Sequence, residues 1–272
     1  MAITNFIPEI WSSKMLISFQ TQAVWAGLTN REYEGDLQSG NKLHITSPVP
    51  ITIKDYKAAN RTTSADAIED TGIELDVDQE KSFDFYVDDI DRAQAAGNLQ
   101  AYTQSAADGL VQDADKFLAA LAVTQSTDVT PGAPATDAKS AWNVLRDLTK
   151  ALNKAAVPAA QRVFVANAEF NALLQEHDSK MMNADQSGTT AGLREASLGR
   201  ILGLDGYWSE NLPVTDTPQV VAFHRSALAF VSQVQKTEAM RAENKFADRL
   251  RGLHVYGAKV VRPTAVVSYT AA

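Results

Sequence analysis

Apolar and polar residues alternate along two neighbouring segments in the first third of the chain. The apolar positions of these two segments are Leu43, Ile45, Val49, Ile51 and Ile53, followed by Ile73, Leu75, Val77, Phe83, Phe85 and Val87. A period of two is typical of a β-strand that has one apolar face. The segments therefore predict a long β-ribbon over residues 41–88.

The two arms of this ribbon can be paired antiparallel so that the numbers of facing residues sum to 128. This register gives four apolar pairs, which are Leu43 with Phe85, Ile45 with Phe83, Ile51 with Val77, and Ile53 with Leu75. Because every pair sets an apolar side chain against another, we expect this register. Residues 55–72 are polar and rich in Ala, Thr, Asp and Asn, so they predict a loose tip.

The apolar face of the predicted ribbon needs a cover. An isolated hairpin is only marginally stable in water, and each apolar side chain contributes about 1.5–3 kcal/mol when fully buried. Either the body of the chain or a neighbouring copy could bury this face. Arms of about 40 Å are long for the first arrangement and suit the second.

The remaining pattern predicts helices and strands in an irregular order. Helices are expected at residues 8–27, 89–123, 138–155 and 169–177, and strands at residues 162–166, 219–224, 227–231, 252–261 and 264–269. Residues 127–137 contain two prolines and a glycine and predict a domain boundary, while residues 178–196 predict a polar loop. This order indicates an α+β fold rather than a regular βαβ series.

Composition narrows the class of protein. The 272 residues have a 45% apolar fraction and a net charge of −8, with no run of eighteen apolar residues and no signal-peptide pattern at the N-terminus. The absence of cysteine excludes disulfides and thiolate chemistry. The acidic balance argues against a dedicated nucleic-acid binder, because the cations are scattered apart from a mild cluster at Lys245, Arg249 and Arg251.

Candidate chemistry is sparse along the chain. His44, His177, His224 and His254 lie far apart without metal-ligand spacing, and no nucleotide-binding or nucleophile motif is present. The acidic run at residues 88–91 is typical of a helix N-terminus. The sequence therefore predicts no catalytic, cofactor-binding or metal site.

Three collinear stretches carry a resemblance to a known family. They are residues 83–91 (FDFYVDDID), 197–213 (SLGRILGLDGYWSENLP) and 246–263 (FADRLRGLHVYGAKVVRP). The first resembles the junction between the long loop and the spine helix of the Hong Kong 97-type major capsid proteins of tailed bacteriophages. The second is similar to a Gly-rich strand of their A-domain, and the third to their last helical turn and peripheral-domain strands. The order of segments over almost the whole chain matches this family.

The resemblance implies a division of the chain into five parts. These are an N-terminal arm (residues 1–40), an E-loop ribbon (41–88), a P-domain spine helix (89–126), an A-domain (127–231) and C-terminal P-domain strands (232–272). It also implies that a neighbouring subunit covers the ribbon. The expected E-loop interface residues are Leu43, Ile45, Ile51, Ile53, Leu75, Val77, Phe83 and Phe85, and those of the arm are Ile10, Trp11, Phe19 and Trp25.

The resemblance further implies a structural protein of the virion. Pentamers and hexamers would tile an icosahedral head, made in the bacterial host cytoplasm, that encloses double-stranded DNA without sequence-specific contact and without a membrane. The expected partners are a separate scaffolding protein, a portal and a decoration protein. Lys54 and Lys57 lie near the ribbon tip, but the partner asparagine of the isopeptide crosslink found in some relatives cannot be matched.

Two alternatives remain at this point. An encapsulin, a bacterial nanocompartment shell protein, has the same fold and a similar length, and its shell would hold cargo protein instead of nucleic acid. A soluble α+β enzyme or binding module would work alone, as a stable monomer.

Overall fold

The computed structural model describes residues 23–35, 41–48, 53–58, 60–63, 70–89, 100–176 and 198–271. Of the helix expected at residues 8–27, only α1 (Trp25–Leu28) falls within these ranges. The loop expected at residues 178–196, and Ile10, Trp11, Phe19 and Ile51, lie outside them.

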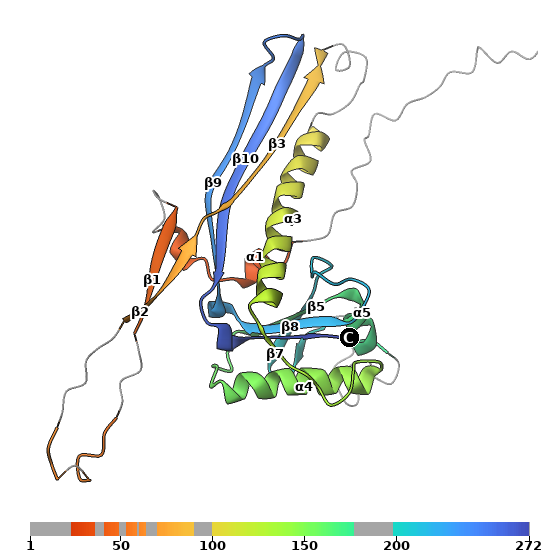
Figure 1. The fold of residues 1–272 in the computed structure, drawn as a ribbon. Coiled ribbons are helices and arrows are strands. Elements are labelled where there is room, and N and C mark those ends of the chain that lie inside the picture. The colour runs from red at the N-terminus through yellow and green to blue at the C-terminus, as the bar shows by residue number, and fades with distance from the viewer. Residues whose placement is uncertain are drawn as a thin grey trace, which may run out of the picture.

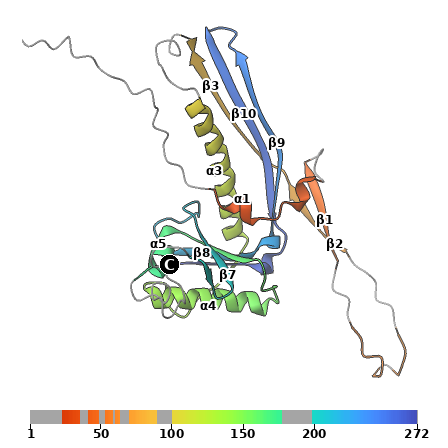
Figure 2. The ribbon, with the colours of Figure 1, turned by 180° about the vertical axis from the view of Figure 1, so that it is seen from behind.

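The chain forms two sheets and a projecting hairpin (Figure 1). A six-stranded sheet has the order β4-β11-β8-β5-β7-β6, and a three-stranded sheet has the order β3-β10-β9. The three-stranded sheet rises away from the six-stranded one, and the hairpin β1-β2 extends to one side (Figures 1 and 2).

The six-stranded sheet is built around two fully buried central strands. These are β5 (Arg162–Ala166) and β8 (Gln219–His224), and they lie antiparallel. The other strands are β4 (Thr127–Asp128), β6 (Arg200–Ile201), β7 (Leu204–Trp208) and β11 (Val266–Thr270). The strands predicted at residues 162–166 and 219–224 are confirmed, because continuous apolar runs are typical of strands buried on both faces.

Two helices cover one face of this sheet. α4 (Ala138–Lys154) begins at Asp137, which forms a capping box with Ser140. α5 (Ala168–Leu174) begins at Asn167, whose side chain accepts the N–H of Phe170. Both helices lie within a few residues of their predicted positions. Leu145 and Leu148 of α4 and Phe170 of α5 belong to one buried cluster with Phe164 of β5.

The three-stranded sheet consists of β3 (Gln79–Asp88), β9 (Leu228–Arg241) and β10 (Ala247–Val260). β9 and β10 both extend farther than the predicted strands at residues 227–231 and 252–261. The helical turn expected just after residue 246 is wrong, because β10 begins at Ala247 and pairs with both neighbouring strands. The chain then passes through a short 3-10 turn, Pro263–Ala265, into β11.

A long helix, α3 (Gln100–Thr124), runs beside this sheet (Figure 1). The Tyr256 hydroxyl of β10 donates to Asp113 Oδ2 at 2.8 Å, and the Tyr256 ring packs edge-on against Phe117. The helix predicted at residues 89–123 is thus present from Gln100 onward, and residues 90–99 lie outside the described part. α3 ends one residue beyond the prediction.

The predicted ribbon register is wrong. β1 (Lys42–Pro48) pairs with β2 (Asp70–Asp76) so that Leu43 faces Leu75 and Ile45 faces Ile73, a register whose numbers sum to 118. β3 does not join the hairpin at all and pairs with β10. The two registers differ by an even number of residues, so both keep the same side chains on the same face. The alternation could not distinguish them.

Candidate assembly surfaces

The base of the hairpin is covered by its own chain. Ile45, Leu75 and Val77 are buried against Ala229 and Val231 of β9. Leu75 is 0% exposed, so it has no surface to offer a neighbour. The expectation that a second subunit covers the whole ribbon is therefore wrong for these three side chains.

A close backbone crossing fixes the hairpin to the body. A Cβ atom added at Gly257 of β10 would lie 2.3 Å from the backbone oxygen of Asp76 and 2.8 Å from Cα of Val77. Both neighbours are backbone atoms that cannot rotate away. Glycine at this position therefore allows the end of β2 to lie directly on β10.

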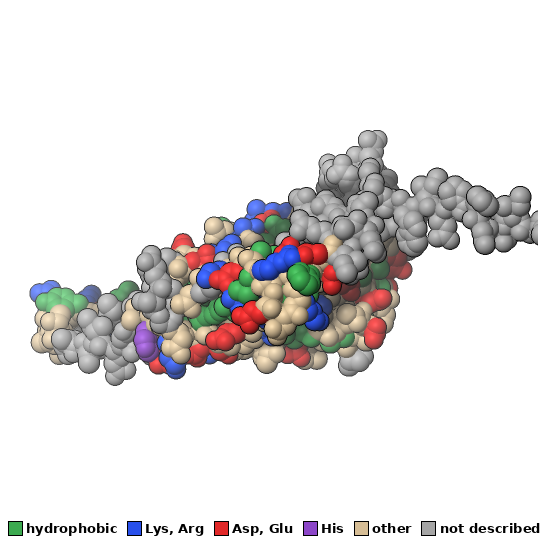
Figure 3. Space-filling model, turned by 90° about the horizontal axis from the view of Figure 1, so that it is seen from above, with side chains coloured by type: hydrophobic (Ala, Val, Ile, Leu, Met, Phe, Trp, Pro, Cys, Tyr) green, Lys and Arg blue, Asp and Glu red, His purple; other side chains and the backbone are tan. Residues whose placement is uncertain are grey.

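The tip of the hairpin, in contrast, is open to solvent. Ile53 is 96% exposed and Tyr56 is 54% exposed. Asp55 Oδ1 accepts the N–H of Lys57 at 2.9 Å, and this hydrogen bond forms a local turn around Tyr56. Apolar and basic side chains gather at this remote end of the molecule (Figure 3). Ile53 and Tyr56 thus receive little cover from the described part of their own chain.

Phe83 and Phe85 lie on the α3 side of the three-stranded sheet. Their rings stack at 6.0 Å, and both side chains are half-buried. Their cross-strand partners are Gly252 and Leu250, on the same face as Tyr256, which contacts α3. The ring of Phe83 occupies the space above Gly252, where a Cβ would come within 2.2 Å of it. The two phenylalanines therefore serve a packing role within their own subunit and keep only part of their surface for a neighbour.

The opposite face of this sheet carries a ladder of ion pairs. Arg249 binds both carboxylate oxygens of Asp84, and Arg251 donates to Glu238 at 2.6 Å. Lys236 lies 2.6 Å from the other oxygen of Glu238. Lys236 and Arg251 together lower the pKa of Glu238 to about 2. Two members of the basic cluster noted in the sequence, Arg249 and Arg251, are thus paired with carboxylates of neighbouring strands.

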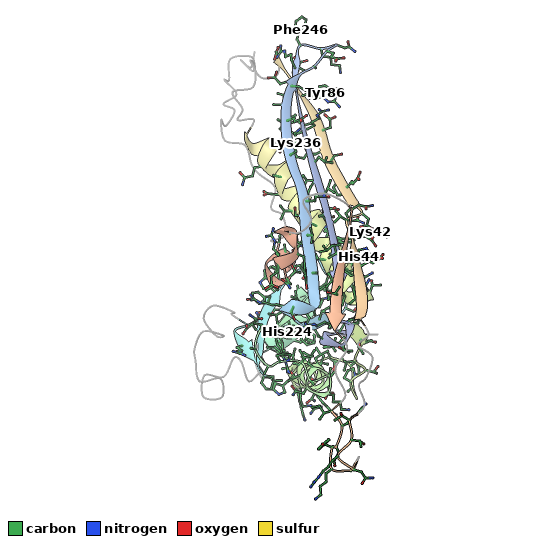
Figure 4. The ribbon with its side chains drawn as sticks, turned by 90° about the vertical axis from the view of Figure 1, so that its left-hand side faces the viewer. Lys42, His44, Tyr86, His224, Lys236 and Phe246 are labelled. Carbon is green, nitrogen blue, oxygen red and sulfur yellow. The ribbon has the colours of Figure 1, made fainter. Side chains whose placement is uncertain are left out.

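The far end of the three-stranded sheet combines an exposed aromatic with fixed charges (Figure 4). Phe246 is 82% exposed in the turn between β9 and β10. Arg241 forms ion pairs with Asp89 and with Asp248, the latter at 2.9 Å. Asp89, expected at a helix N-terminus, is thus linked to the last residue of β9. Arg249 and Lys245 approach the Tyr86 ring at 5.5 Å and 5.7 Å.

Trp25 belongs to the core, not to a subunit boundary. It is 0% exposed and stacks on Phe223 of β8 at 5.4 Å. Its placement at an interface between subunits is a correction to the sequence-based expectation. The physical reason is that a short helix turns the ring inward over the six-stranded sheet, next to α3.

A buried carboxylate anchors this short helix. Asp115 of α3 is 0% exposed, and its Oδ1 accepts the N–H groups of Val24, Trp25 and Ala26 at 3.0, 2.7 and 3.4 Å. Its Oδ2 accepts Nδ2 of Asn211 at 2.8 Å. Burial raises the pKa of Asp115, while the four hydrogen bonds lower it. The sequence analysis missed this residue.

The described histidines do not form a reactive site. His44 is exposed beside Glu74, while His224 and His254 are buried and hydrogen-bonded to Ser226 and Ser232. Burial lowers the pKa of both buried imidazoles. Within the described ranges, no group of three potential metal ligands comes together, and no helix is long and apolar enough to cross a membrane.

Comparison with known proteins identifies the family. The family model described as phage capsid protein matches residues 71–269. A solved structure from Mycobacterium phage Che8 is 52% identical, covers 98% of both chains and superposes with a TM-score of 0.92. No curated protein matches the chain.

More distant structures share the fold. The capsid structure of Cyanophage P-SCSP1u is 15% identical, covers 98% of this chain and 94% of its own, and has a TM-score of 0.82. The mature capsid of bacteriophage PhiM1 is 15% identical, covers 97% and 92%, and has a TM-score of 0.75. A family match over most of the chain, joined to this fold, leads to one conclusion: the chain belongs to the phage capsid protein family.

Proposed function

We propose that this chain is the major capsid protein of a tailed bacteriophage, and that it assembles as pentamers and hexamers into the icosahedral head around double-stranded DNA. The observation that carries the proposal is the family match over residues 71–269. The comparisons do not favour an encapsulin shell or a lone soluble enzyme. Structural proteins make up this family, so we infer that the chain has no catalytic role and needs no cofactor.

The hairpin supplies the proposed contact between subunits. Its base is fixed to the body by buried side chains and by the close crossing at Gly257, while its tip presents Ile53 to solvent. A firmly held base with an exposed apolar end suits an element that reaches onto an adjacent copy. We infer that Ile53, with the outer surfaces of Leu43, Phe83 and Phe85, contacts the next subunit.

The remaining inferences concern location and partners. The head would be made in the bacterial host cytoplasm, with a separate scaffolding protein, a portal and a decoration protein. The net charge of −8 favours enclosure of DNA without sequence-specific contact. We keep the division of the chain into arm, E-loop, spine helix, A-domain and C-terminal strands as part of this proposal.

Sedimentation of an Ile53→Asp variant tests this function. Because Ile53 is 96% exposed, the unassembled chain should keep its thermal stability. Burying an unpaired carboxylate in each subunit contact costs several kcal/mol, so fast-sedimenting shells should be lost. Thr46→Asp, at an exposed position on β1 of the same hairpin, is the matched control and should assemble. If Ile53→Asp forms normal shells, the hairpin tip does not make the proposed contact between subunits.

A further inference from the structure

The outer side of α4 carries a cationic face in an otherwise acidic protein. Arg146, Lys150 and Lys154 are all exposed and are spaced one turn apart. With Thr149, Asn153 and Leu202 they line a shallow hollow of about 460 Å³. Arg146 pairs with Asp147 at 3.0 Å, but no described carboxylate forms an ion pair with Lys150 or Lys154. The core packing of the domain does not require these charges.

The same domain has an acidic surface around an exposed tryptophan. Trp208, at the end of β7, is 55% exposed and pairs with Ala166 at the end of β5. Two residues on, Glu210 accepts the N–H of Ala168. Glu169 is exposed in the first turn of α5. The loop that carries the exposed Asp216 is tied to the same helix, because Asn167 Nδ2 donates to the backbone oxygen of Thr217 at 2.7 Å.

These two surfaces lie at opposite ends of the domain. The N–H of Ala138, the first residue of α4, donates to Glu176 just after α5 at 2.7 Å. α5 therefore adjoins the beginning of α4, and the cationic residues occupy its other half. A helix of 17 residues is about 25 Å long. Figure 1 shows α4 running along the lower edge of the domain with α5 near one end.

We infer that the cationic half of α4 in one copy docks against the acidic surface around Trp208 in the next copy. A second copy of the chain is the occupant because the two surfaces are complementary in charge. The guanidinium and ammonium groups of α4 would pair with Glu169 and Asp216 of the next copy, and such cations are also attracted to the face of an indole ring. Opposite charges at the two ends of one domain fit a head-to-tail contact, which closes into a ring when the rotation permits. With a net charge of −8 per chain, DNA is the less favoured occupant.

This inference rests on the proposed shell function and names two surfaces that would meet within it. Exposed charges act mainly on the rate and register of association, so their effect should depend on salt. The Lys150→Glu/Lys154→Glu variant should form shells at least tenfold more slowly than wild type at about 50 mM NaCl. The difference should shrink at about 500 mM NaCl, where the charges are screened.

Two further variants make the experiment specific. Lys116→Glu/Arg262→Glu changes the net charge equally at exposed positions outside α4 and should assemble as wild type. Adding Glu169→Lys/Asp216→Lys to the α4 variant restores opposite charges and should recover the rate. Light scattering follows assembly, and melting of the unassembled chains reports folding.

Four results would overturn the inference. Unchanged assembly of the α4 variant, or equal slowing of the control pair, would show that these two surfaces do not meet. Normal assembly with loss of retained DNA would assign the cationic face to the genome instead. A wild-type chain that never forms shells would overturn the proposed function, and the inference with it.

Discussion

Asp115→Ala should detach the short helix α1 from α3. In the wild type, one carboxylate accepts three consecutive backbone N–H groups and the side-chain amide of Asn211. Alanine leaves all four donors without this acceptor, and the N–H of Trp25 is fully buried. Each buried unsatisfied donor costs about 1–3 kcal/mol. Some of this cost is offset because the desolvated charge is removed as well.

The expected net loss is about 3 kcal/mol in the free energy of unfolding. Asp115→Asn is the matched comparison. Its amide oxygen can still accept the N–H groups of α1. Its amide nitrogen can donate to Oδ1 of Asn211 once the Asn211 amide flips, because Nδ2 of Asn211 faces this position in the wild type and Oδ1 is buried without a partner in the described structure. We therefore expect Asp115→Asn to stay within about 1 kcal/mol of wild type at neutral pH.

The pH dependence follows from the raised pKa of Asp115. A carboxyl whose folded pKa exceeds its unfolded value favours the folded state at low pH, and this contribution is lost as the pH rises through the folded pKa. The free energy of unfolding of Asp115→Asn, relative to that of wild type, should therefore be highest at neutral pH and should decrease as the pH falls toward 3.8.

Urea unfolding of the unassembled chain measures these free energies, and hydrogen exchange at Val24, Trp25 and Ala26 measures the anchor directly. Asp115→Ala should accelerate exchange at these three amides. A loss below about 1 kcal/mol with unchanged exchange would refute the role assigned to Asp115.

Three further predictions concern the body of the subunit. Gly257→Ala should lower the free energy of unfolding by about 1–3 kcal/mol, because its Cβ meets the backbone of β2. Gly109→Ala, in an open position on α3, should instead raise the free energy of unfolding by about 0.5–1 kcal/mol. Thermal melting compares the two variants, and equal shifts in melting temperature would contradict this prediction. Tyr256→Phe should cost about 1 kcal/mol through the lost hydrogen bond to α3, and a urea midpoint that does not move would contradict this. Because the pKa of His254 is lowered in the folded chain, stability falls as the pH drops below 6.5, where the unfolded chain takes up a proton. His254→Gln should make the melting temperature decline less steeply between pH 7 and pH 5. An unchanged slope would contradict this role of His254.

The sequence predicted the positions of helices and strands best where their apolar residues are completely buried. β5, β8 and α4 were located within one residue, because a continuous apolar run or a helical stripe with a clear cap has few alternative structures. β9 was predicted too short because its outer half, from Ser232 to Arg241, is mostly polar. Those polar residues lie on a sheet whose exposed face is held by ion pairs, and the apolar pattern carries no signal for such a strand.

Pairing between distant strands could not be read from the alternation. β3 shares the period of the hairpin, but its partner β10 lies more than 150 residues away in the chain. The apolar faces of β1 and β2 are buried by β9, another distant strand. Sequence patterns specify which face of a strand is apolar, and the three-dimensional arrangement decides what covers it.

Asp115 did leave a signal in the sequence. It lies three, four and seven residues before Leu118, Ala119 and Ala122, all of which are 0% exposed. A carboxylate on the apolar stripe of a helix needs buried hydrogen-bond partners. The partners themselves, at the N-terminal helix and near residue 211, could only be found in the folded structure.

Electron microscopy of the purified full-length chain tests the central claim most directly. We predict closed icosahedral shells in which the Ile53 tip of each hairpin contacts an adjacent subunit. A stable, homogeneous monomer, or a shell in which this tip touches no neighbour, would contradict it.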